Sequence, residues 1–264
     1  MYLEMRFRNE YGLNRQMRFE DVQEASMNNY WNERSSSYSE MNMRQFYSEQ
    51  KNTWEWMIFS RVKEDRPLNV LDIGTGPGFF AILAALRGHK VTAVDMNGKM
   101  LVNARKNARR AGVQVNFQQV GHELPFPEKS FDLILSRDVT WTLTEPEKQL
   151  RTWVRILKEE GTLLYFDAEW NFHLRNQECF DKWQEAKKAM EEKGLEFYSK
   201  AEELDQIAAT LPMTYRKRPE WDAQFWRGEK MQCSVHENLN SVIFNEEEQL
   251  RYQLHPVFLV EVRR

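Results

Sequence analysis

The sequence predicts an α/β fold in which a mostly parallel sheet is flanked by helices, and three observations support this prediction. Between about residues 67 and 170, short apolar runs alternate with amphipathic stretches, which is typical of strands joined by helices. At residues 70–78 a buried-strand pattern runs directly into three alternating glycines. The 264 residues, 41% of them hydrophobic, supply a substantial core, so wholesale disorder is excluded.

Residues 1 to about 66 form the first of three zones and are rich in Met, Arg, Tyr and Trp. Their hydrophobic residues recur at helical rather than alternating spacing. The zone ends at Arg66-Pro67, because proline disfavours a helical conformation in the residue before it. We expect residues 1–66 to form a helical cap.

The second zone alternates predicted strands with predicted helices. The strands cover 70–73, 91–95, 115–119, 133–136 and 162–166, and the helices cover 78–86, 98–111 and 146–158. Right-handed crossovers place the loops that follow parallel strands along one edge of the sheet. Open α/β folds bind their ligands at this edge, so we expect the site there.

The third zone begins with a helical segment at residues 177–193 and continues through a stretch at 212–230 that contains proline and tryptophan. Two strand-like runs at 233–244 and 256–262 would then form a hairpin at the edge of the sheet. We therefore expect one α/β domain over residues 67–264, with an insertion at about 172–231 that could fold over the edge of the sheet where the site is expected.

Composition excludes several classes of function. A formal net charge of -3 provides no global attraction to polyanions, which disfavours a dedicated nucleic-acid binder. Cys179 and Cys233 have no nearby Cys or His at metal-ligand spacing, so we expect reduced thiols and no metal site. The amino terminus lacks the apolar centre of a signal peptide, and the apolar run at 79–86 is shorter than the roughly 20 residues of a membrane span. These features predict a soluble, cytoplasmic protein.

The glycine loop is the strongest functional signal in the chain. Glycines at a strand-to-helix turn let a ligand approach the main chain closely. Dinucleotide-binding turns usually have the spacing G-x-G-x-x-G, whereas this loop has G-x-G-x-G and is preceded by Asp72. A carboxylate there would repel a pyrophosphate and could hold a cation such as a sulfonium. Asp95 ends the next predicted strand, where it could accept hydrogen bonds from ribose hydroxyls. A dinucleotide oxidoreductase stays an alternative.

Residues 70–78 resemble motif I of the class I S-adenosylmethionine-dependent methyltransferases, in the broad type 11 group that includes ubiquinone-biosynthesis-type enzymes. The similarity covers about residues 68–170, where Leu124-Pro125-Phe126 and Ser130-Phe131-Asp132 also match, and is fainter at 255–264. The resemblance implies a Rossmann-like class I methyltransferase fold with seven strands. It also implies S-adenosyl-L-methionine as the cofactor and S-adenosyl-L-homocysteine as the product.

The resemblance further implies roles for individual residues around the cofactor. The family's acidic adenine contact is replaced here by Val120, so backbone groups of the two following residues would take over. Arg137 would line the methionine end of the cofactor or form an ion pair with Asp138. The expected cofactor-binding residues are Tyr30, Asp72, Gly74, Thr75, Gly76, Gly78, Asp95, Met96, Gly121, His122 and Arg137.

Methyl transfer from a sulfonium is an in-line displacement that depends mainly on alignment and exclusion of water. A catalytic triad or metal is therefore not required, and a general base is optional. His173 and Asp167, which follow the fifth predicted strand, are the candidate bases. A histidine or aspartate in such a loop could equally have no catalytic role.

Several aromatic residues could form the substrate side, because aromatic faces suit an apolar or aromatic acceptor. They could instead pack the added helices onto the core. The expected substrate-binding residues are Trp31, Tyr38, Trp141, Trp221 and Trp226. We expect a small-molecule methyltransferase; the alternatives are an RNA or protein methyltransferase that uses residues 216–230, and a non-catalytic protein that binds the cofactor. The sequence does not indicate an oligomeric state.

Overall fold

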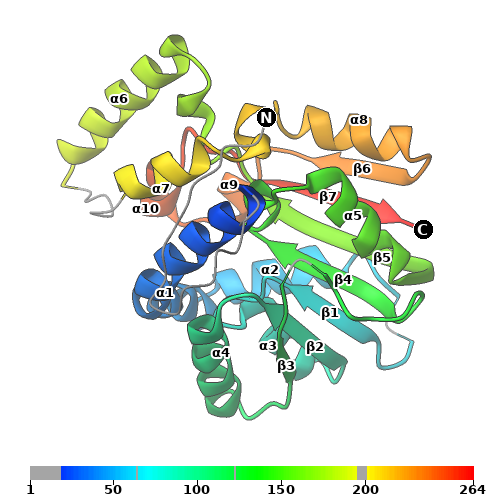
Figure 1. The fold of residues 1–264 in the computed structure, drawn as a ribbon. Helices are drawn as coiled ribbons and strands as arrows, with labels where there is room; N and C mark the ends of the chain where they lie inside the picture. The colour runs from blue at the N-terminus through cyan, green and yellow to red at the C-terminus, as the bar shows by residue number, and fades with distance from the viewer. Residues whose placement is uncertain (1–18, 64, 122, 195–200) are drawn as a thin grey trace, which may run out of the picture.

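The computed structural model describes residues 19–63, 65–121, 123–194 and 201–264. Its centre is one seven-stranded sheet with the order β3-β2-β1-β4-β5-β7-β6 (Figure 1). Strands β1 to β5 run parallel to one another, and β7 runs antiparallel to both β5 and β6. The strands are β1 (Asn69–Ile73), β2 (Lys90–Asp95), β3 (Asn116–Gln119), β4 (Phe131–Arg137), β5 (Leu157–Asp167), β6 (Gln232–His236) and β7 (Phe258–Arg263).

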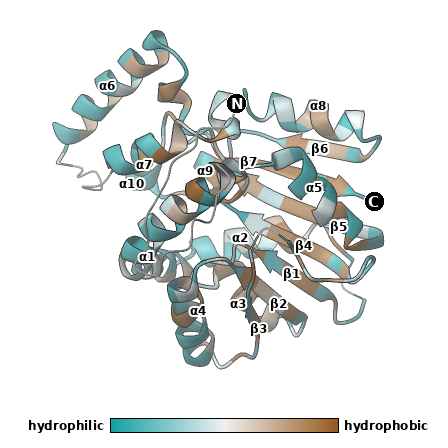
Figure 2. Cartoon of the chain, in the orientation of Figure 1, coloured by the Kyte–Doolittle hydropathy of each residue, from teal (hydrophilic) through white to brown (hydrophobic). Residues whose placement is uncertain are grey.

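Helices cover both faces of the sheet and bury two apolar clusters, and the strands are correspondingly the most hydrophobic part of the ribbon (Figure 2). The first cluster packs side chains of β1, β4 and β5 against α2 (Gln50–Phe59) and α3 (Phe79–Leu86). The second packs the opposite face against α5 (Pro146–Arg155) and α8 (Glu220–Gly228). Strands that are buried on both faces explain the continuous apolar runs in the second zone of the sequence.

Helix α1 (Phe19–Phe46) packs against α4 (Gly98–Arg110) at one end and α7 (Ala201–Ala208) at the other. A third apolar cluster joins α1 to the segment around α7 through Met27, Tyr30, Ile207 and Leu211. This position sets α1 across the end of the sheet where the glycine loop lies, so it can cover a ligand bound there (Figure 1).

The segment after β5 is mainly helical. It contains η2 (Phe172–Leu174), α6 (Gln177–Glu191), α7, η3 (Pro212–Tyr215) and α8. The side chain of Asn176 begins α6 by accepting a hydrogen bond from the backbone N–H of Cys179. Helix α6 projects away from the sheet (Figure 1), and Met190 is its buried residue.

The five predicted parallel strands are confirmed, but two predicted boundaries are wrong. The helix predicted to reach residue 158 ends at Arg155, because Ile156 and Leu157 are fully buried and β5 begins at Leu157. The strand predicted over 233–244 ends at His236, and residues 240–243 form α9 (Asn240–Ile243). The Asn240 side chain bonds to the backbone at Tyr252 and Val257, which turns the chain away from the sheet.

The two carboxy-terminal strands pair antiparallel at the sheet edge, as predicted. They are joined through α9 and α10 (Glu246–Arg251) rather than by a tight hairpin turn. Within the described ranges, no helix combines the length and the apolar character needed to cross a membrane.

Candidate functional site

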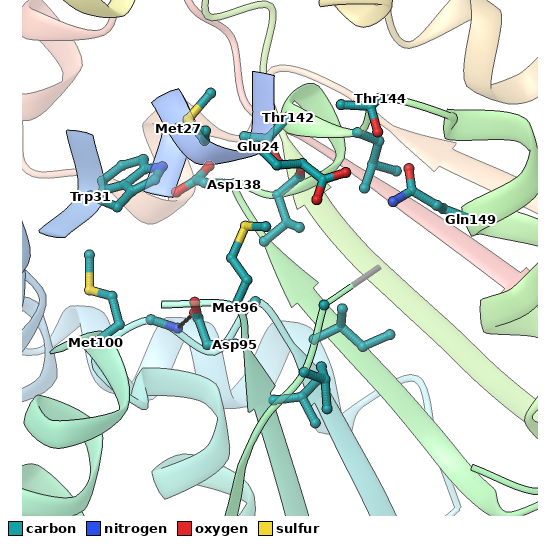
Figure 3. Close-up of a pocket in the computed structure, with 18 of the residues that line it drawn as sticks. Glu24, Met27, Trp31, Asp95, Met96, Met100, Asp138, Thr142, Thr144 and Gln149 are labelled. Carbon is teal, nitrogen blue, oxygen red and sulfur yellow. Dashed lines mark hydrogen bonds between the residues drawn. The ribbon is translucent and has the colours of Figure 1, made fainter. Parts of the chain in front are cut away.

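The carboxyl ends of β1, β2, β3 and β4 meet at one edge of the sheet and open onto a cavity, which we call the glycine-loop cavity. The chain order reverses between β1 and β4, and open α/β sheets bind ligands at such a switch point. Figure 3 shows Met27 and Trp31 of α1 opposite Asp95 and Met100, with Asp138 beside Trp31. The loops supply Gly74, Gly76, Asp95, Met96, Gly121 and Arg137 to the lining.

The glycine loop takes a backbone conformation that few other residues adopt. Gly74 and Gly76 have φ angles of 65° and 52°. A Cβ on Gly74 would lie 2.2 Å from Cγ2 of Val139, whereas a Cβ on Gly76 would meet only Cε1 of Tyr38, at 3.7 Å. Gly74 therefore permits close packing against the end of β4, and Gly76 leaves the main chain open to the cavity.

Asp72 supports this loop through hydrogen bonds to its side chain. Its Oδ2 accepts hydrogen bonds from the Thr75 hydroxyl at 2.6 Å and from the backbone N–H of Ala81 at 3.0 Å. Burial raises the pKa of Asp72 to about 7, although both hydrogen bonds oppose the shift. Asp72 and Thr75 line a small recess behind Gly74 and Gly76, and Gly78 begins α3 against Ala104. The structure thus places these three predicted residues in support of the loop.

Asp95 ends β2 and holds the glycine loop to the next turn. Its Oδ2 accepts a hydrogen bond from the Gly76 N–H, and its Oδ1 accepts one from the Asn97 N–H, both at 2.8 Å. Burial raises the pKa of Asp95 to about 6 against the effect of these hydrogen bonds. Met96 and Gly121 line the same cavity. His122, predicted beside them, lies outside the described residues.

Helix α1 forms the wall opposite the glycine loop through Met27, Trp31 and Tyr38. The Asn97 side chain fastens it there by donating hydrogen bonds to the carbonyl and side-chain oxygens of Asn28, at 3.0 and 2.8 Å. Tyr30 does not reach this wall. It lines neither cavity and is buried against the segment around α7, with its ring centroid 5.3 Å from that of Trp31.

Arg137 ends β4 between three aromatic rings. Its guanidinium carbon lies 5.0 Å from the ring centroids of Trp54 and Phe79, and its Nη2 donates to Oδ1 of Asn42 at 3.0 Å. Its Nε lies 3.4 Å from Oδ2 of Asp138. The buried Nη1 makes no hydrogen bond within the described part of the chain. The sequence left two alternative roles for Arg137, and the structure shows both: it lines the cavity and forms an ion pair with Asp138.

A second cavity of about 290 Å³ adjoins the first, and we call it the aromatic cavity. Residues of α1, the loop after β5, α6 and the segment after α10 form its walls. Trp31, Tyr38, Arg137 and Asp138 line both cavities. Its further aromatic lining includes Trp54, Trp141, Trp170, Trp183 and Tyr252.

Comparison with known proteins agrees with this geometry. Residues 71–165 match the family model of the methyltransferase domain, and they include β1, most of the loops at the glycine-loop cavity, and β5 up to Tyr165. Over this range the chain is similar to S-adenosylmethionine-dependent methyltransferases.

Two curated relatives and one solved structure illustrate the similarity to other methyltransferases. The uncharacterized methyltransferase YcgJ of Bacillus subtilis is 36% identical over 100 residues, covering 37% of this chain and 40% of the relative. The ubiquinone/menaquinone biosynthesis C-methyltransferase UbiE of Vibrio vulnificus is 35% identical over 105 residues, with the same coverage of 37% and 40%. The chain therefore spans about two fifths of these relatives.

The structural comparison shows the same fold. Phosphoethanolamine N-methyltransferase 2 of Haemonchus contortus, solved with phosphomonomethylethanolamine and S-adenosylhomocysteine, superposes with a TM-score of 0.56 at 17% identity. The superposition covers 80% of this chain and 52% of that chain. The similarity in fold therefore reaches beyond residues 71–165 and includes most of the sheet and helices.

The structure does not leave Asp167 available as a base. Asp167 is fully buried and accepts hydrogen bonds from the Thr140 hydroxyl and from the Trp141 and Ala168 N–H groups, both at 2.9 Å. Arg218 pairs with it at 3.0 Å. It lines neither cavity, so the structure corrects its predicted role to that of a structural anchor.

His173 lines the aromatic cavity, as does Trp141. The imidazole stacks on Trp183 with ring centroids 4.6 Å apart, and its Nε2 lies 3.0 Å from Oδ1 of Asp205. Its Nδ1 is buried with no hydrogen-bond partner in the described segments. The structure thus brings His173 to the wall of the cavity, held between α6 and α7.

Trp221 and Trp226 are not at either cavity. Both belong to α8, which packs along β6 and β7. Trp226 is buried and donates a hydrogen bond to the Tyr165 hydroxyl at 2.9 Å, and Trp221 stacks on Phe225. Their predicted substrate role is therefore corrected to packing, because α8 covers the sheet face rather than its carboxyl edge.

Asp138 is a site residue that the sequence analysis considered only as an ion-pair partner. It follows the last residue of β4 with a φ of 57° and lines both cavities. An acidic residue directly after a predicted strand was the available signal. In the part of the chain that the structure describes, no group of three or more His, Cys, Asp or Glu side chains is placed to hold a metal ion.

Proposed function

We propose that the protein transfers a methyl group from S-adenosylmethionine to a small aromatic or apolar acceptor. The observation that carries this proposal is the meeting of the glycine-loop cavity and the aromatic cavity at Arg137 and Asp138. In-line transfer requires the donor and acceptor to be held in adjoining pockets, aligned and shielded from water. The acceptor class goes beyond what the family resemblance implies.

The residues of the glycine-loop cavity fit this cofactor. Gly76 leaves the main chain open, since a Cβ there would still clear its neighbour, and Asp95 retains lone pairs for ribose hydroxyls. Met96 and Gly121 would contact the adenine. The unpaired Nη1 of Arg137 would bind the carboxylate of the methionine tail. When bound, the cofactor supplies a methyl group activated by the positive charge on sulfur.

The aromatic cavity supports a small planar acceptor. Its wall of tryptophan and tyrosine rings offers apolar faces and edges to another ring. Trp31, Tyr38 and Trp141 would bind the acceptor next to the donor, and His173 and Trp183 would bind its far end. The lining also includes positively and negatively charged side chains, such as Arg137 and Asp205, which can interact with polar substituents on the acceptor.

Calorimetry with S-adenosylhomocysteine tests the proposal directly. We expect this compound to bind, and we expect NADH to bind far more weakly, because the loop spacing and Asp72 disfavour a pyrophosphate. Incubation with methyl-labelled S-adenosylmethionine and an extract of small metabolites should then yield labelled product of low mass. Binding of NADH in preference to S-adenosylhomocysteine would contradict the proposal, and label found only in protein or RNA would contradict the small acceptor.

A further inference from the structure

We propose that Asp138 is a catalytic residue that accepts a proton from the methyl acceptor, so that the acceptor is an aromatic compound with a reactive O–H or N–H group. This inference rests on the proposed function and names its substrate class more narrowly. It is carried by the position of Asp138 between the two cavities, by its backbone conformation and by its few polar contacts.

Asp138 lies where the transferred group must pass from one cavity to the other. Trp31, Tyr38, Arg137 and Asp138 line both cavities, and Asp138 is the carboxylate among them. The Arg137 guanidinium is already held by aromatic rings and by Asn42. The carboxylate of Asp138 is therefore the acidic side chain placed closest to where donor and acceptor meet, and Figure 3 shows it beside Trp31.

The backbone holds Asp138 firmly in this position. Its φ of 57° is uncommon for a residue other than glycine, asparagine or aspartate. Its N–H donates to the Phe166 carbonyl at 2.9 Å, and its carbonyl accepts from Nε1 of Trp141 at 3.0 Å. The neighbouring strand β5 and the turn after β4 thus fix the backbone position of Asp138. Sparsely populated backbone conformations of this kind concentrate at functional sites.

The carboxylate of Asp138 keeps capacity for a ligand. Its contact with Nε of Arg137 is long, at 3.4 Å, and the Trp170 side chain, which donates to Asp167 at 2.9 Å, is its other hydrogen-bond donor. A carboxylate offers about four lone-pair sites, so capacity remains. By contrast, Asp167 is surrounded by donors and closed off from the cavity. His173 has its Nε2 against Asp205 and its Nδ1 buried. Asp138 is thus better placed than either predicted base.

The charged and titratable groups that surround Asp138 suit proton transfer near neutral pH. They are Arg137 on β4, Asp167 on β5, Tyr38 on α1 and Tyr252 after α10. Burial raises the pKa of Asp138 to about 7, Arg137 opposes this shift and Asp167 adds to it. A base with a pKa near the working pH is the most effective one for general base catalysis.

The proposed step is balanced. A lone pair of the acceptor oxygen or nitrogen forms the new bond to the methyl carbon, while the carbon–sulfur bond breaks and its electron pair remains on sulfur. The proton of the acceptor passes to the Asp138 carboxylate, which becomes a neutral carboxylic acid. Release of that proton to water restores the charged form, so no oxidant or metal is needed.

Three ring-matched probes test the acceptor class in the presence of S-adenosylhomocysteine. 4-Ethylphenol and 4-ethylaniline each carry a donor hydrogen, whereas 4-ethylanisole has the same ring system without one. Binding can be followed by tryptophan fluorescence, because Trp31, Trp141 and Trp183 line the cavity. We expect the two hydrogen donors to bind about 10-fold more tightly than 4-ethylanisole, as a hydrogen bond to a charged group predicts.

Asp138→Asn and Asp138→Gly separate binding from proton transfer. Both residues tolerate a positive φ, so the turn is retained. The asparagine can still accept a hydrogen bond and should keep the preference for 4-ethylphenol, whereas the glycine should abolish it. With S-adenosylmethionine, methyl transfer to 4-ethylphenol by the wild type should rise through about pH 7. The asparagine variant should be slower by about 100-fold or more, with that pH dependence lost.

The outcomes distinguish this inference from the proposed function. If S-adenosylhomocysteine binds but 4-ethylanisole binds as tightly as the two hydrogen donors, or neither donor is methylated, this inference fails and the proposed function stands. An unchanged rate and pH profile in Asp138→Asn would also overturn it. If S-adenosylhomocysteine does not bind at all, the proposed function itself fails.

Discussion

The carboxylates Asp72, Asp95 and Asp138 show how position in the sheet determines the charge state of a side chain. All three lie at or near the carboxyl edge, where burial raises their pKa values to about 7, 6 and 7. Asp132 begins β4 at the opposite edge. Burial alone would raise the pKa of Asp132, but hydrogen bonds from Arg66, the Asn69 N–H and Lys158 hold it at about 2. Burial thus raises the pKa of the carboxyl groups at the candidate site, whereas hydrogen bonds and ion pairs lower that of Asp132.

Gly74→Ala should damage the cofactor loop more than the same change at another glycine with positive φ. The new Cβ would lie 2.2 Å from Val139, and the φ of 65° adds backbone strain, so we expect a loss of about 2–4 kcal/mol. Gly88→Ala is the control, since its φ is 83° but nothing lies within 4 Å, and it should lose about 1–2 kcal/mol. Urea unfolding compares the two variants, and equal losses would contradict the packing argument.

Asp95→Asn should weaken cofactor binding and should change the stability of the ligand-free protein in a way that depends on pH. We expect S-adenosylhomocysteine to bind about 1–3 kcal/mol more weakly, because charged hydrogen bonds to the ribose are lost. The pKa of Asp95 is raised to about 6 in the folded protein, so its contribution to stability is fully present at acid pH and lost as pH rises through 6.

The ligand-free Asp95→Asn variant should therefore gain stability relative to the wild type as the pH rises from about 4 to about 6, and keep that gain at higher pH. Calorimetry measures the affinity, and urea unfolding below and above this range measures the stability. A stability difference that does not change with pH would show that Asp95 does not titrate as described.

At the scale of elements, a buried polar network joins α8 to β5 and to the turn after β4. Arg218 contacts Asp167 at 3.0 Å, Asp222 at 2.8 Å and the Thr140 hydroxyl at 2.7 Å. Burial alone would lower the pKa of Arg218, but the two carboxylates more than offset this and raise it. The Tyr165 hydroxyl extends the network by donating to Asp222 at 2.8 Å. The elements on either side of the network are thereby held in one arrangement.

Arg218→Met should be strongly destabilising, because it leaves two buried carboxylates without their cation. We expect the free energy of unfolding to fall by about 3–5 kcal/mol. Arg216→Met is the matched control two residues away, where a half-exposed ion pair with Glu147 at 3.0 Å contributes only about 0–1 kcal/mol. Denaturant unfolding of both variants measures the contrast. A loss at Arg218 no larger than that at Arg216 would contradict the role of the network.

At the scale of the whole molecule, the sheet supplies the cofactor loops while helices outside the family match supply much of the rest of the site. α1, α6 and α7 lie outside residues 71–165. They contribute Trp31, Tyr38, Trp183 and Asp205 to the cavities. The lining of the glycine-loop cavity thus comes largely from the matched residues, while the aromatic cavity is built largely by segments outside them.

Cofactor binding should protect α1 from hydrogen exchange. Met27, Trp31 and Tyr38 form one wall of the glycine-loop cavity, so a bound ligand would oppose local opening of the helix. We expect slower exchange over residues 21–46 when S-adenosylhomocysteine is added, measured by mass spectrometry. Helix α8, which packs against the other side of the sheet, is the internal control and should not change. Equal protection of α8, or no protection of α1, would show that α1 does not cover the ligand.

The strand-to-helix turn could be predicted from the sequence, because local spacing encodes it. Residues 70–78 combine a run of buried residues with alternating glycines, and the β1 strand, the positive φ angles and the contact with Asp95 follow. The limits of the helix after residue 146 and of the strand after 233 could not be predicted in the same way. They depend on burial of Ile156 and on the hydrogen bonds of Asn240, which come from distant parts of the chain.

By itself, the sequence determined the α/β class, the approximate positions of the parallel strands and the residues of the glycine loop, since each follows from patterns over a few neighbouring residues. Only the tertiary structure decided which aromatic and acidic side chains reach a cavity. Trp31 and Tyr30 are neighbours in the helix and their rings touch, yet Trp31 lines both cavities and Tyr30 lines neither. Asp138 and Asp167 both follow strands, but Arg218 neutralises Asp167 and leaves Asp138 facing the site. Such selection depends on the packing of distant segments, which short-range patterns do not encode.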